Sequence, residues 1–285
     1  MLNLTPLRDE PGTIDQIFEI DCVADKDTRQ AHIDSALKRN LPWVVTRKRR
    51  KGKVAIVASG PSVTDYVDEL KAFDGEIWGI NRAFEWMRHR GVKPTGFLGV
   101  DPEWFLVEAL PNIPEDATYY LAAQVHPDVF DHLKGRNVRL WFMADSQVKL
   151  PWGTDQFQIW GGSTCLSRAP NLAYVLGYRE VHVYGGDSSY TNKTHVHEGE
   201  GLPSNIVLFN VDGEIFPTSK AMISQACEFV EQFPEWAKGK EPLSVTVHGG
   251  GLISALLQQK LGSGDYERYL REQLAEDTKH LRRAI

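Results

Sequence analysis

One stretch, residues 53–63, constrains the fold of this chain more than any other. Residues 54–58 form a short apolar run with β-branched side chains, which predicts a buried parallel strand. The turn at residues 59–62 follows directly, and apolar residues with helical spacing then predict a helix from residue 63 to about residue 70. The stretch therefore predicts a strand, a tight glycine turn and the start of a helix in direct succession.

This succession is a physical device for holding an anion. Gly60 lets the backbone come close to a ligand, Ser62 can cap the helix, and the free N–H groups of the first helical turn point at the ligand. We therefore predict that Ser59, Gly60, Pro61 and Ser62 bind an anion such as a phosphate group. The alternative is an ordinary strand-to-helix turn that binds nothing.

The composition excludes some kinds of partner. Hydrophobic residues make up 42% of the 285 residues and charged residues 25%, which is ordinary for a globular protein with a substantial core. The net charge of −6 leaves no general positive field that would attract nucleic acid or an anionic membrane. The dense basic cluster at residues 47–53 is predicted to be a solvated linker, with a phosphate-facing rim as the alternative.

Three widely spaced cysteines, Cys22, Cys165 and Cys227, predict neither a disulfide framework nor a zinc site, and they fit a reducing compartment. No apolar run approaches the roughly 20 residues that a membrane helix needs, and the amino terminus has no signal-peptide pattern. We therefore expect a cytoplasmic protein that does not bind membranes. Whether it forms a homo-oligomer is left open.

From residue 52 onward, predicted strands alternate with predicted helices. Further strands are predicted over 76–81, 95–100, 117–122, 138–142, 180–184 and 243–247, and helices over 82–90, 127–133, 161–176, 219–233 and 252–261. Pro170 should kink the helix predicted over 161–176 or shift its start. The alternation predicts an α/β fold with a mostly parallel sheet that carries helices on both faces.

Three regions follow from this pattern. Residues 1–50 are predicted to be an irregular, partly helical amino-terminal extension that packs on the main domain. Residues 51–262 form the α/β domain, and residues 263–285 form a charged carboxy-terminal helix.

Polar residues follow several of the predicted strands directly. In parallel sheets ligands bind outside the carboxyl ends of the strands, and Ser59, Ser62, Asn81, Asp101 and Asp187 are placed there. A carboxylate in this position can hold Mg²⁺, bind a ribose hydroxyl or act as a base. The alternative for a lone aspartate is a helix cap or an Asx turn.

Two further segments carry candidate groups. In the polar loop after residue 187, His195 or His197 is a candidate proton carrier or metal ligand, with incidental histidines as the alternative. Gly162, Ser163 and Thr164 form a second glycine turn that leads into a helix, and hence a second candidate anion site. The common P-loop, Gly-x-Gly-x-x-Gly and Gly-x-Ser-x-Gly motifs are absent, so a bound nucleotide would use a different loop.

The order of the short motifs resembles a known family. The motifs are Gly-Pro-Ser at 60–62, Ile-Asn at 80–81, Gly-Val-Asp at 99–101, Gly-Gly-Ser-Thr at 161–164, Gly-Gly-Asp-Ser-Ser-Tyr at 185–190, Pro-Thr-Ser at 217–219 and Gly-Gly-Gly at 249–251. Together they resemble the archaeal 6-hydroxymethylpterin diphosphokinase-like (MptE-like) family over roughly residues 52–257. The resemblance implies a Rossmann-like nucleotide-binding transferase domain. It also implies distant kinship with motility accessory factors and with bacterial sialyltransferases that use a CMP-sugar.

The diphosphokinase branch implies a Mg²⁺-dependent reaction. ATP and Mg²⁺ would lie over the Gly60 turn, Asp101 and Asp187 would hold the metal, and a hydroxymethyl acceptor would attack the β-phosphorus and release AMP. Gly162, Ser163 and Thr164 would contact the nucleotide. The pair Thr194-His195 resembles this branch, which makes His195 a catalytic candidate.

The sialyltransferase branch implies a different reaction at the same place. The turn would hold the CMP phosphate, Asn81 would contact the nucleotide, and Tyr190 would stabilise the departing CMP. Two positions depart from that branch, since Asp101 stands where it has an asparagine and Ile215-Phe216 where its general-base histidine is expected. We therefore expect the diphosphokinase-like enzyme first and the CMP-sugar glycosyltransferase second. A non-catalytic nucleotide-binding or assembly protein is the third alternative.

Overall fold

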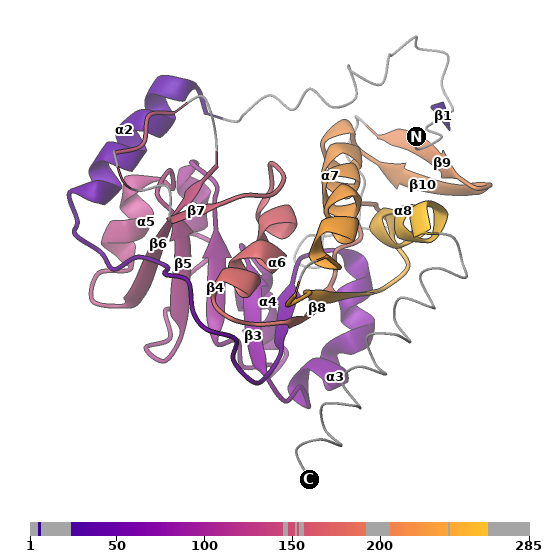
Figure 1. Ribbon diagram of the computed structural model, residues 1–285, viewed down its shortest axis with the longest axis horizontal. Coiled ribbons are helices and arrows are strands. Elements are labelled where there is room, and N and C mark those ends of the chain that lie inside the picture. The colour runs from indigo at the N-terminus through magenta and orange to yellow at the C-terminus, as the bar shows by residue number, and fades with distance from the viewer. Residues whose placement is uncertain are drawn as a thin grey trace.

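The computed structural model describes residues 5–6, 24–144, 148–151, 153, 157–191, 206–238 and 240–261. Its centre is an eight-stranded sheet in the order β11-β8-β2-β3-β4-β5-β6-β7, and every neighbouring pair is parallel (Figure 1). The strands are β2 (Val54–Val57), β3 (Glu76–Ile80), β4 (Gly96–Gly99), β5 (Thr118–Ala122), β6 (Asn137–Met143), β7 (Gln158–Ile159), β8 (Glu180–Tyr184) and β11 (Ser244–His248). The predicted α/β class with a parallel, Rossmann-like sheet is confirmed.

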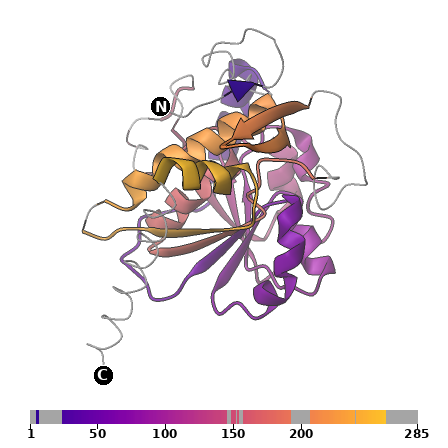
Figure 2. The same ribbon diagram turned by 90° about the vertical axis from the view of Figure 1, so that its right-hand side faces the viewer.

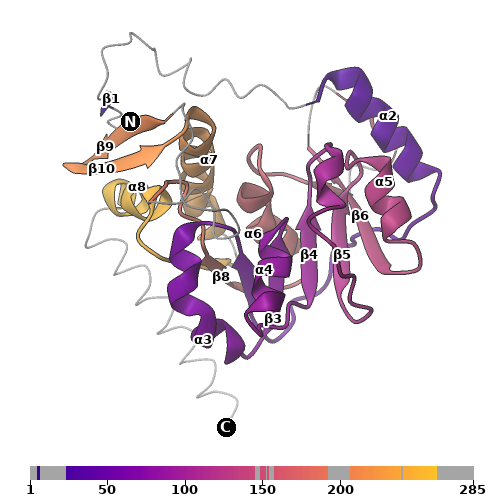
Figure 3. The same cartoon turned by 180° about the vertical axis from the view of Figure 1, so that it is seen from behind.

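Helices cover both faces of this sheet. They are α2 (Lys26–Leu37), η1 (Pro61–Tyr66), α3 (Val67–Lys71), α4 (Ala83–His89), η2 (Trp104–Leu106), α5 (Pro127–His132), α6 (Cys165–Val175), α7 (Lys220–Trp236) and α8 (Leu252–Leu261). All of β2 is buried, and its alternate side chains serve different layers. Ala55 and Val57 pack with residues of α3 and α4 (Figure 3), whereas Val54 and Ile56 belong to the larger core with α6 and α7.

A small antiparallel sheet was not predicted. It consists of β9 (Val207–Val211), β10 (Glu214–Thr218) and the short β1 (Thr5–Pro6), and it lies beside α7 and α8 (Figure 2). The two-residue turn Asp212-Gly213 has positive φ at both residues, 52° and 94°. Asp-Gly between apolar runs is a strong sequence signal for such a hairpin, so the hairpin could have been found.

Two helix predictions need correction. The chain after the first glycine turn forms a 3₁₀ helix, η1, before it becomes the short α3, because Pro61 fits the first position of a helix and leaves no N–H to place. The helix predicted over 161–176 starts at Cys165, after its cap Thr164, and runs on to Val175 with Pro170 inside it. The carboxy-terminal helix expected at 263–285 lies outside the described residues.

The described part of the amino-terminal extension packs on the main domain. Arg39, just after α2, forms an ion pair with Asp131 in α5. Trp43 then makes a parallel bridge to Leu140 in β6, and its ring stacks on Phe157 with centroids 4.8 Å apart. The segment between α2 and β2 therefore runs across the sheet from β6 towards β2 (Figure 1).

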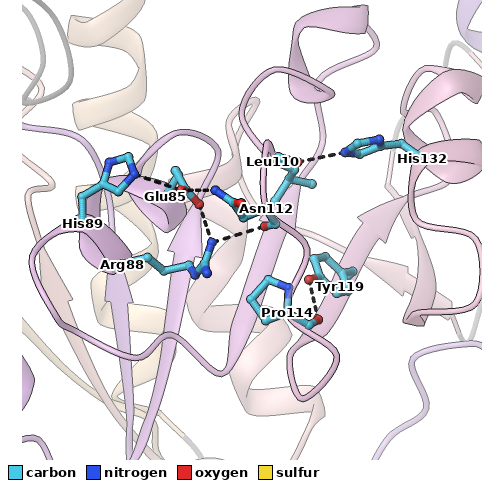
Figure 4. Close-up of polar contacts among 8 residues, drawn as sticks. All are labelled: Glu85, Arg88, His89, Leu110, Asn112, Pro114, Tyr119 and His132. Carbon is cyan, nitrogen blue, oxygen red and sulfur yellow. Dashed lines mark hydrogen bonds and ion pairs between the residues drawn. The ribbon is translucent and has the colours of Figure 1, made fainter.

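One buried carboxylate holds the loop between η2 and β5 against α4. Glu85 in α4 is 8% exposed. It accepts hydrogen bonds from Arg88 at 2.8 Å and from the side-chain amide of Asn112 at 2.9 Å, and it lies 3.1 Å from Nε2 of His89 (Figure 4). Nothing in the local sequence pattern of α4 indicates Asn112 as a partner, because the two residues are 27 positions apart.

Replacing Glu85 by alanine should lower the free energy of unfolding by about 2 kcal/mol, since the part-buried hydrogen bonds that its carboxylate accepts from Arg88 and Asn112 are lost together. Urea unfolding measures the change. The matched control is Asp68→Ala in α3, where a highly exposed carboxylate pairs with Lys71 and should contribute little. An equal loss in both variants would show that Glu85 has no special structural role.

Candidate functional site

The predicted polar residues gather at one edge of the sheet. Because all eight strands are parallel, their carboxyl ends meet there. The turn at 59–62 follows β2, Asn81 follows β3, Asp101 follows β4 and Asp187 follows β8. The chain leaves β2 towards η1 and α3 on one face, whereas α6 on the other face leads into β8, so the neighbours β2 and β8 form the switch point at which such sheets bind ligands.

The carboxylate of Asp187 is hydrogen-bonded to another residue of the chain, Ser62. Its side chain is 5% exposed, and Oδ2 accepts the backbone N–H of Ser62 at 2.8 Å while Oδ1 accepts the Ser62 hydroxyl. Burial raises the pKa of Asp187, and the two hydrogen bonds from Ser62 oppose that rise. The Asp187 carboxylate thus accepts the backbone N–H of Ser62, one of the groups that the sequence predicts to bind the phosphate of a ligand.

Backbone contacts pack the turn after β2 against the loops after β8 and β11. The N–H of Gly60 donates to the carbonyl of Gly185 at 2.9 Å, and a Cβ added to Gly60 would lie 2.4 Å from that carbonyl oxygen. A Cβ added to Gly251 would lie 2.4 Å from the carbonyl oxygen of Asp187. Within the described residues, Ser59 is the member of the turn that has donors but no hydrogen-bond partner, so it is the one free to contact a ligand.

Asn81 adopts a backbone conformation that is rare for residues other than glycine. Its φ is 49°, a region in which asparagine is among the tolerated residues and which often marks functional positions. Its N–H donates to the carbonyl of Leu98 at 3.2 Å. Its side-chain Oδ1 is buried and has no partner among the described residues. Asn81 therefore presents a free acceptor at the end of β3.

One of the two carboxylate oxygens of Asp101 is hydrogen-bonded within its own loop. Oδ1 accepts the backbone N–H of Glu103 at 3.0 Å, which is the Asx turn that the alternative interpretation expects. Within the described residues Oδ2 has no hydrogen-bond partner. Burial raises the pKa of Asp101, and the charge of Glu103 adds to the rise. Burial, with the charge of Asp101 adding to it, raises the pKa of the Cys165 thiol at the start of α6.

The two aspartates that the sequence suggests as metal ligands, Asp101 and Asp187, follow strands that are not neighbours in the sheet. The strands that precede them, β4 and β8, are separated by β2 and β3, which corresponds to about 14 Å of sheet. Among the residues that the structure describes, no group of three or more His, Cys, Asp or Glu side chains is arranged to hold a metal ion. Both carboxylate oxygens of Asp187 accept hydrogen bonds from Ser62. Asp101 differs, because within the described residues its Oδ2 has no hydrogen-bond partner.

The second glycine turn also contains an internal anion. The carboxylate of Glu228 in α7 accepts the backbone N–H of Ser163 at 2.8 Å and its hydroxyl at 2.9 Å. Thr164 caps α6 through a reciprocal pair with Ser167. A Cβ added to Gly162 would lie 2.4 Å from the Glu228 carboxylate, so this turn is closed around it. The anion site predicted at Gly162, Ser163 and Thr164 is thus filled by the protein itself.

The chain after Asp187 is tied to the small sheet and to α7. Ser188 has a φ of 48°, and its carbonyl accepts the hydroxyl of Thr218 at 2.8 Å. The N–H of Tyr190 donates to the carbonyl of Pro217 at 2.6 Å, and Tyr190 is 8% exposed. His195 and His197 lie outside the described residues.

Sequence analysis missed a histidine pair near Asp101. His32 in α2 lies beside His126, with ring centroids 5.0 Å apart, and its Nδ1 is 3.1 Å from the carbonyl of Gln124. The amide of Gln124 in turn donates to the carbonyl of Val100, the residue before Asp101, at 3.0 Å. Burial lowers the pKa of His32. No sequence signal indicates this arrangement, because 92 positions separate His32 from its hydrogen-bond partner Gln124.

A second histidine cluster lies at the end of β11, just before the glycine run 249–251. Burial, together with the neighbouring His182, lowers the pKa of His248 to about 4, although the charge of Glu69 opposes the change. Nε2 of His248 is 3.0 Å from Nδ1 of His182, and its ring stacks on Tyr184 at 4.1 Å.

The stability of the protein should therefore fall between pH 6.5 and about 4. In this pH window His248 is protonated in the unfolded chain but stays neutral in the folded one. The free energy of unfolding therefore decreases as the pH falls. Above pH 6.5 His248 is neutral in both states and does not change the stability. Urea unfolding at pH 7 and pH 5 should show a loss about 1 kcal/mol larger for the wild type than for His248→Gln. Identical losses would contradict the assignment.

The described helices include none that is both long and apolar enough to cross a bilayer. The parallel sheet defines a Rossmann-like α/β protein, with polar residues gathered at the carboxyl ends of its strands. Residues 32–193 match the family described as 6-hydroxymethylpterin diphosphokinase MptE-like, and the chain belongs to this family. The match begins inside the predicted extension and ends at 193, so it covers more of the amino-terminal part and less of the carboxy-terminal part than the resemblance suggested.

Solved structures support the same fold. The MAf glycosyltransferase from Magnetospirillum magneticum AMB-1 matches with a TM-score of 0.62 and 17% identity, over 90% of this chain and 43% of that one. The chain thus spans less than half of that protein. A Lactobacillus plantarum protein (TM-score 0.26, 17% identity, 48% of this chain and 46% of that one) and the thiamin pyrophosphokinase of Geobacillus thermodenitrificans (0.24, 14%, 48% and 48%) are too dissimilar to carry an argument. No curated protein matches the chain significantly.

Proposed function

We propose that this protein is a nucleotide-using transferase and that it transfers a pyrophosphoryl group from ATP to a hydroxymethyl acceptor, such as a 6-hydroxymethylpterin. Membership of the MptE-like family supports the reaction class. The observation that carries the proposal is a row of polar atoms that have no partner among the described residues, at the carboxyl ends of three adjacent strands. These are the donors of Ser59 after β2, Oδ1 of Asn81 after β3 and Oδ2 of Asp101 after β4.

Each of these groups fits one part of a nucleotide. The hydroxyl and N–H of Ser59 are donors suited to a phosphate oxygen. The Asn81 oxygen can accept a hydrogen bond from a base amino group or a ribose hydroxyl, which would also relieve the cost of leaving it buried and unpaired. The strain at Asn81 is of the kind that proteins retain at binding sites.

Of the two aspartates, Asp101 is better suited than Asp187 to bind Mg²⁺. Mg²⁺ is commonly held by one or two carboxylates together with substrate phosphates and water, so Asp101 with its free Oδ2 can serve as the protein ligand. Asp187 fits this role poorly, because both of its oxygens are bound to Ser62. When bound, the ion would neutralise charge on the transferring phosphates.

In this reaction the oxygen of the acceptor hydroxyl bonds to the β-phosphorus of ATP. The bond between the β-phosphorus and the oxygen of the α-phosphate breaks at the same time, which releases AMP. The acceptor hydroxyl must lose its proton in this step. His32 is suited to take that proton. Its Nδ1 faces the carbonyl of Gln124, so Nδ1 carries the hydrogen and Nε2 keeps its lone pair. The lowered pKa of His32 keeps the ring neutral and able to accept a proton at pH 7.

One observation favours CMP-sugar glycosyl transfer as a second candidate. Asp187 is taken up by Ser62, which leaves a site with a single free carboxylate, and such a site suits a reaction that does not depend on a metal. In this reaction the same edge would hold the CMP phosphate, and Tyr190, now 8% exposed, would have to be uncovered to reach it. A non-catalytic nucleotide-binding protein is the remaining alternative.

Thermal unfolding with ATP, CMP and CDP, each with and without Mg²⁺, separates these functions. A ligand that binds the folded state alone stabilises it by about 2.7 kcal/mol at a hundredfold excess over its Kd. We expect a Mg²⁺-dependent shift with ATP that is reduced in Asp101→Asn. A metal-independent shift with CMP or CDP would favour glycosyl transfer instead, and no shift with any nucleotide would reject nucleotide binding at this edge.

A further inference from the structure

A cavity of about 240 Å³ lies away from the proposed active site, at the amino edge of the sheet. Its walls come from the segment before β2, the first residues of β3, β5 and β6, and the end of α6. The lining includes Arg47, Arg50, Glu76, Tyr120 and Arg139. With five residues in β5, about 17 Å of strand separates this edge from the carboxyl edge.

The charge of the cavity is strongly positive for a chain with a net charge of −6. Three guanidinium groups, those of Arg47, Arg50 and Arg139, face one carboxylate, that of Glu76. Arg50 lies 3.6 Å from the Glu76 carboxylate. Within the described part of the chain, Arg47 and Arg139 have no carboxylate partner. The cavity thus carries two positive charges in excess.

The arginine-bearing segment is held in place by its backbone. The N–H of Arg47 donates to the carbonyl of Val175 at 2.8 Å, and the N–H of Arg50 donates to the carbonyl of Gly177 at 2.9 Å. Gly177 has a φ of 96°, and a Cβ there would lie 2.4 Å from the carbonyl oxygen of Lys48, so the two segments touch. These bonds also use carbonyls at the end of α6 that would otherwise repel an anion.

The cavity is also lined by a neutral hydrogen-bond donor, the hydroxyl group of Tyr120. Tyr120 in β5 is paired in register with Arg139 in β6, so their side chains lie next to each other on one face of the sheet. Burial raises the pKa of Tyr120 to about 12, and the charge of Glu76 adds to the rise, so the hydroxyl stays protonated and able to donate. The guanidinium of Arg50 is also fixed, because it lies 4.5 Å above the ring of Tyr178.

We propose that this cavity binds a small oxyanion, a phosphate or a carboxylate group, through the guanidinium groups of Arg47, Arg50 and Arg139. Guanidinium groups match both kinds of oxyanion with paired hydrogen bonds. The volume is below the roughly 300 Å³ at which pockets for drug-sized ligands begin, so the ligand is a small anion or the charged end of a larger one. The basic cluster at 47–53 is then an anion-facing rim, at the edge opposite to the Gly60 turn.

Calorimetric titration of the full chain at low salt, with inorganic phosphate in one series and citrate in another, tests this proposal. We expect at least one of the two to bind, and the stronger binder identifies phosphate or carboxylate as the source. Arg47→Gln and Arg139→Gln should each weaken binding by about tenfold or more, since each removes a charge-assisted hydrogen bond.

The matched control is Arg49→Gln, which removes the same charge from the same segment but does not line the cavity. It should change the affinity by less than about twofold, in line with the small effect of a screened exposed charge. Equal weakening by Arg47→Gln and Arg49→Gln would overturn the proposal, as would a failure of both anions to bind. Unchanged urea unfolding of the variants shows that the fold is retained.

Discussion

Replacing Asp101 by asparagine should lower the rate of the proposed transfer by at least about a hundredfold while the protein stays folded. Asparagine keeps the oxygen that accepts the N–H of Glu103 at 3.0 Å, so the loop after β4 should hold its conformation. What disappears is the negative charge of the carboxylate, which is the group suited to hold Mg²⁺ against the phosphates. The measurement is the release of AMP at saturating ATP and Mg²⁺.

Glu108→Gln is the matched control for this experiment. Glu108 is an exposed carboxylate a few residues further along the same connection, and its contact is an ion pair with Arg82 at 3.4 Å. The control should keep turnover within about twofold of the wild type, because exposed ion pairs contribute little. If Asp101→Asn turned over as fast as Glu108→Gln, Asp101 would have no part in the reaction, and the Asx turn would be its whole function.

Replacing Gly251 by alanine should lower the free energy of unfolding by about 3 kcal/mol or more. The new Cβ would lie 2.4 Å from both Cα and the carbonyl oxygen of Asp187, and neither backbone atom can move without opening the loop after β8. The neighbouring Gly250 has nothing within 4 Å of an added Cβ, so Gly250→Ala should leave stability nearly unchanged. Urea unfolding of the pair measures the difference, and similar midpoints would show that the loops are not packed as described.

The same pair of variants has a consequence for binding. The loop that Gly251→Ala displaces carries Asp187, and Asp187 holds Ser62 in the turn after β2. Nucleotide binding should therefore be lost along with stability, whereas Gly250→Ala should bind normally. A variant that is destabilised yet binds with full affinity would show that the turn does not depend on Asp187.

The architecture could be predicted from the sequence because its signals are local. Apolar runs such as 54–58, each followed by a helical pattern, are enough to indicate a parallel sheet, since strands buried on both faces have few other solutions. The order of the strands could not be obtained in this way, because β8 pairs with β2 across 127 residues of sequence (Val54 with Val181) and β11 pairs with β8 across 64 (Glu180 with Ser244). The β9–β10 hairpin, by contrast, has a local sequence signal in its Asp212-Gly213 turn.

The candidate site was predicted less completely, for a similar reason. The positions of Asn81 and Asp101 follow from the strands that precede them. The carboxylates that fill the two predicted anion turns do not, because Asp187 is 125 residues from Ser62 and Glu228 is 65 residues from Ser163. A glycine turn before a helix attracts any anion, and the local sequence does not tell a ligand's phosphate from a carboxylate supplied by the same chain.

The most direct test of the proposed function is the fate of ATP. The full chain is incubated with ATP, Mg²⁺ and a 6-hydroxymethylpterin, and the products are identified by mass spectrometry. The account predicts that one AMP forms for each acceptor that gains a diphosphate, and that Asp101→Asn forms neither. Release of ADP, or no consumption of ATP while CMP is released from a CMP-sugar, would contradict pyrophosphoryl transfer as the reaction of this site.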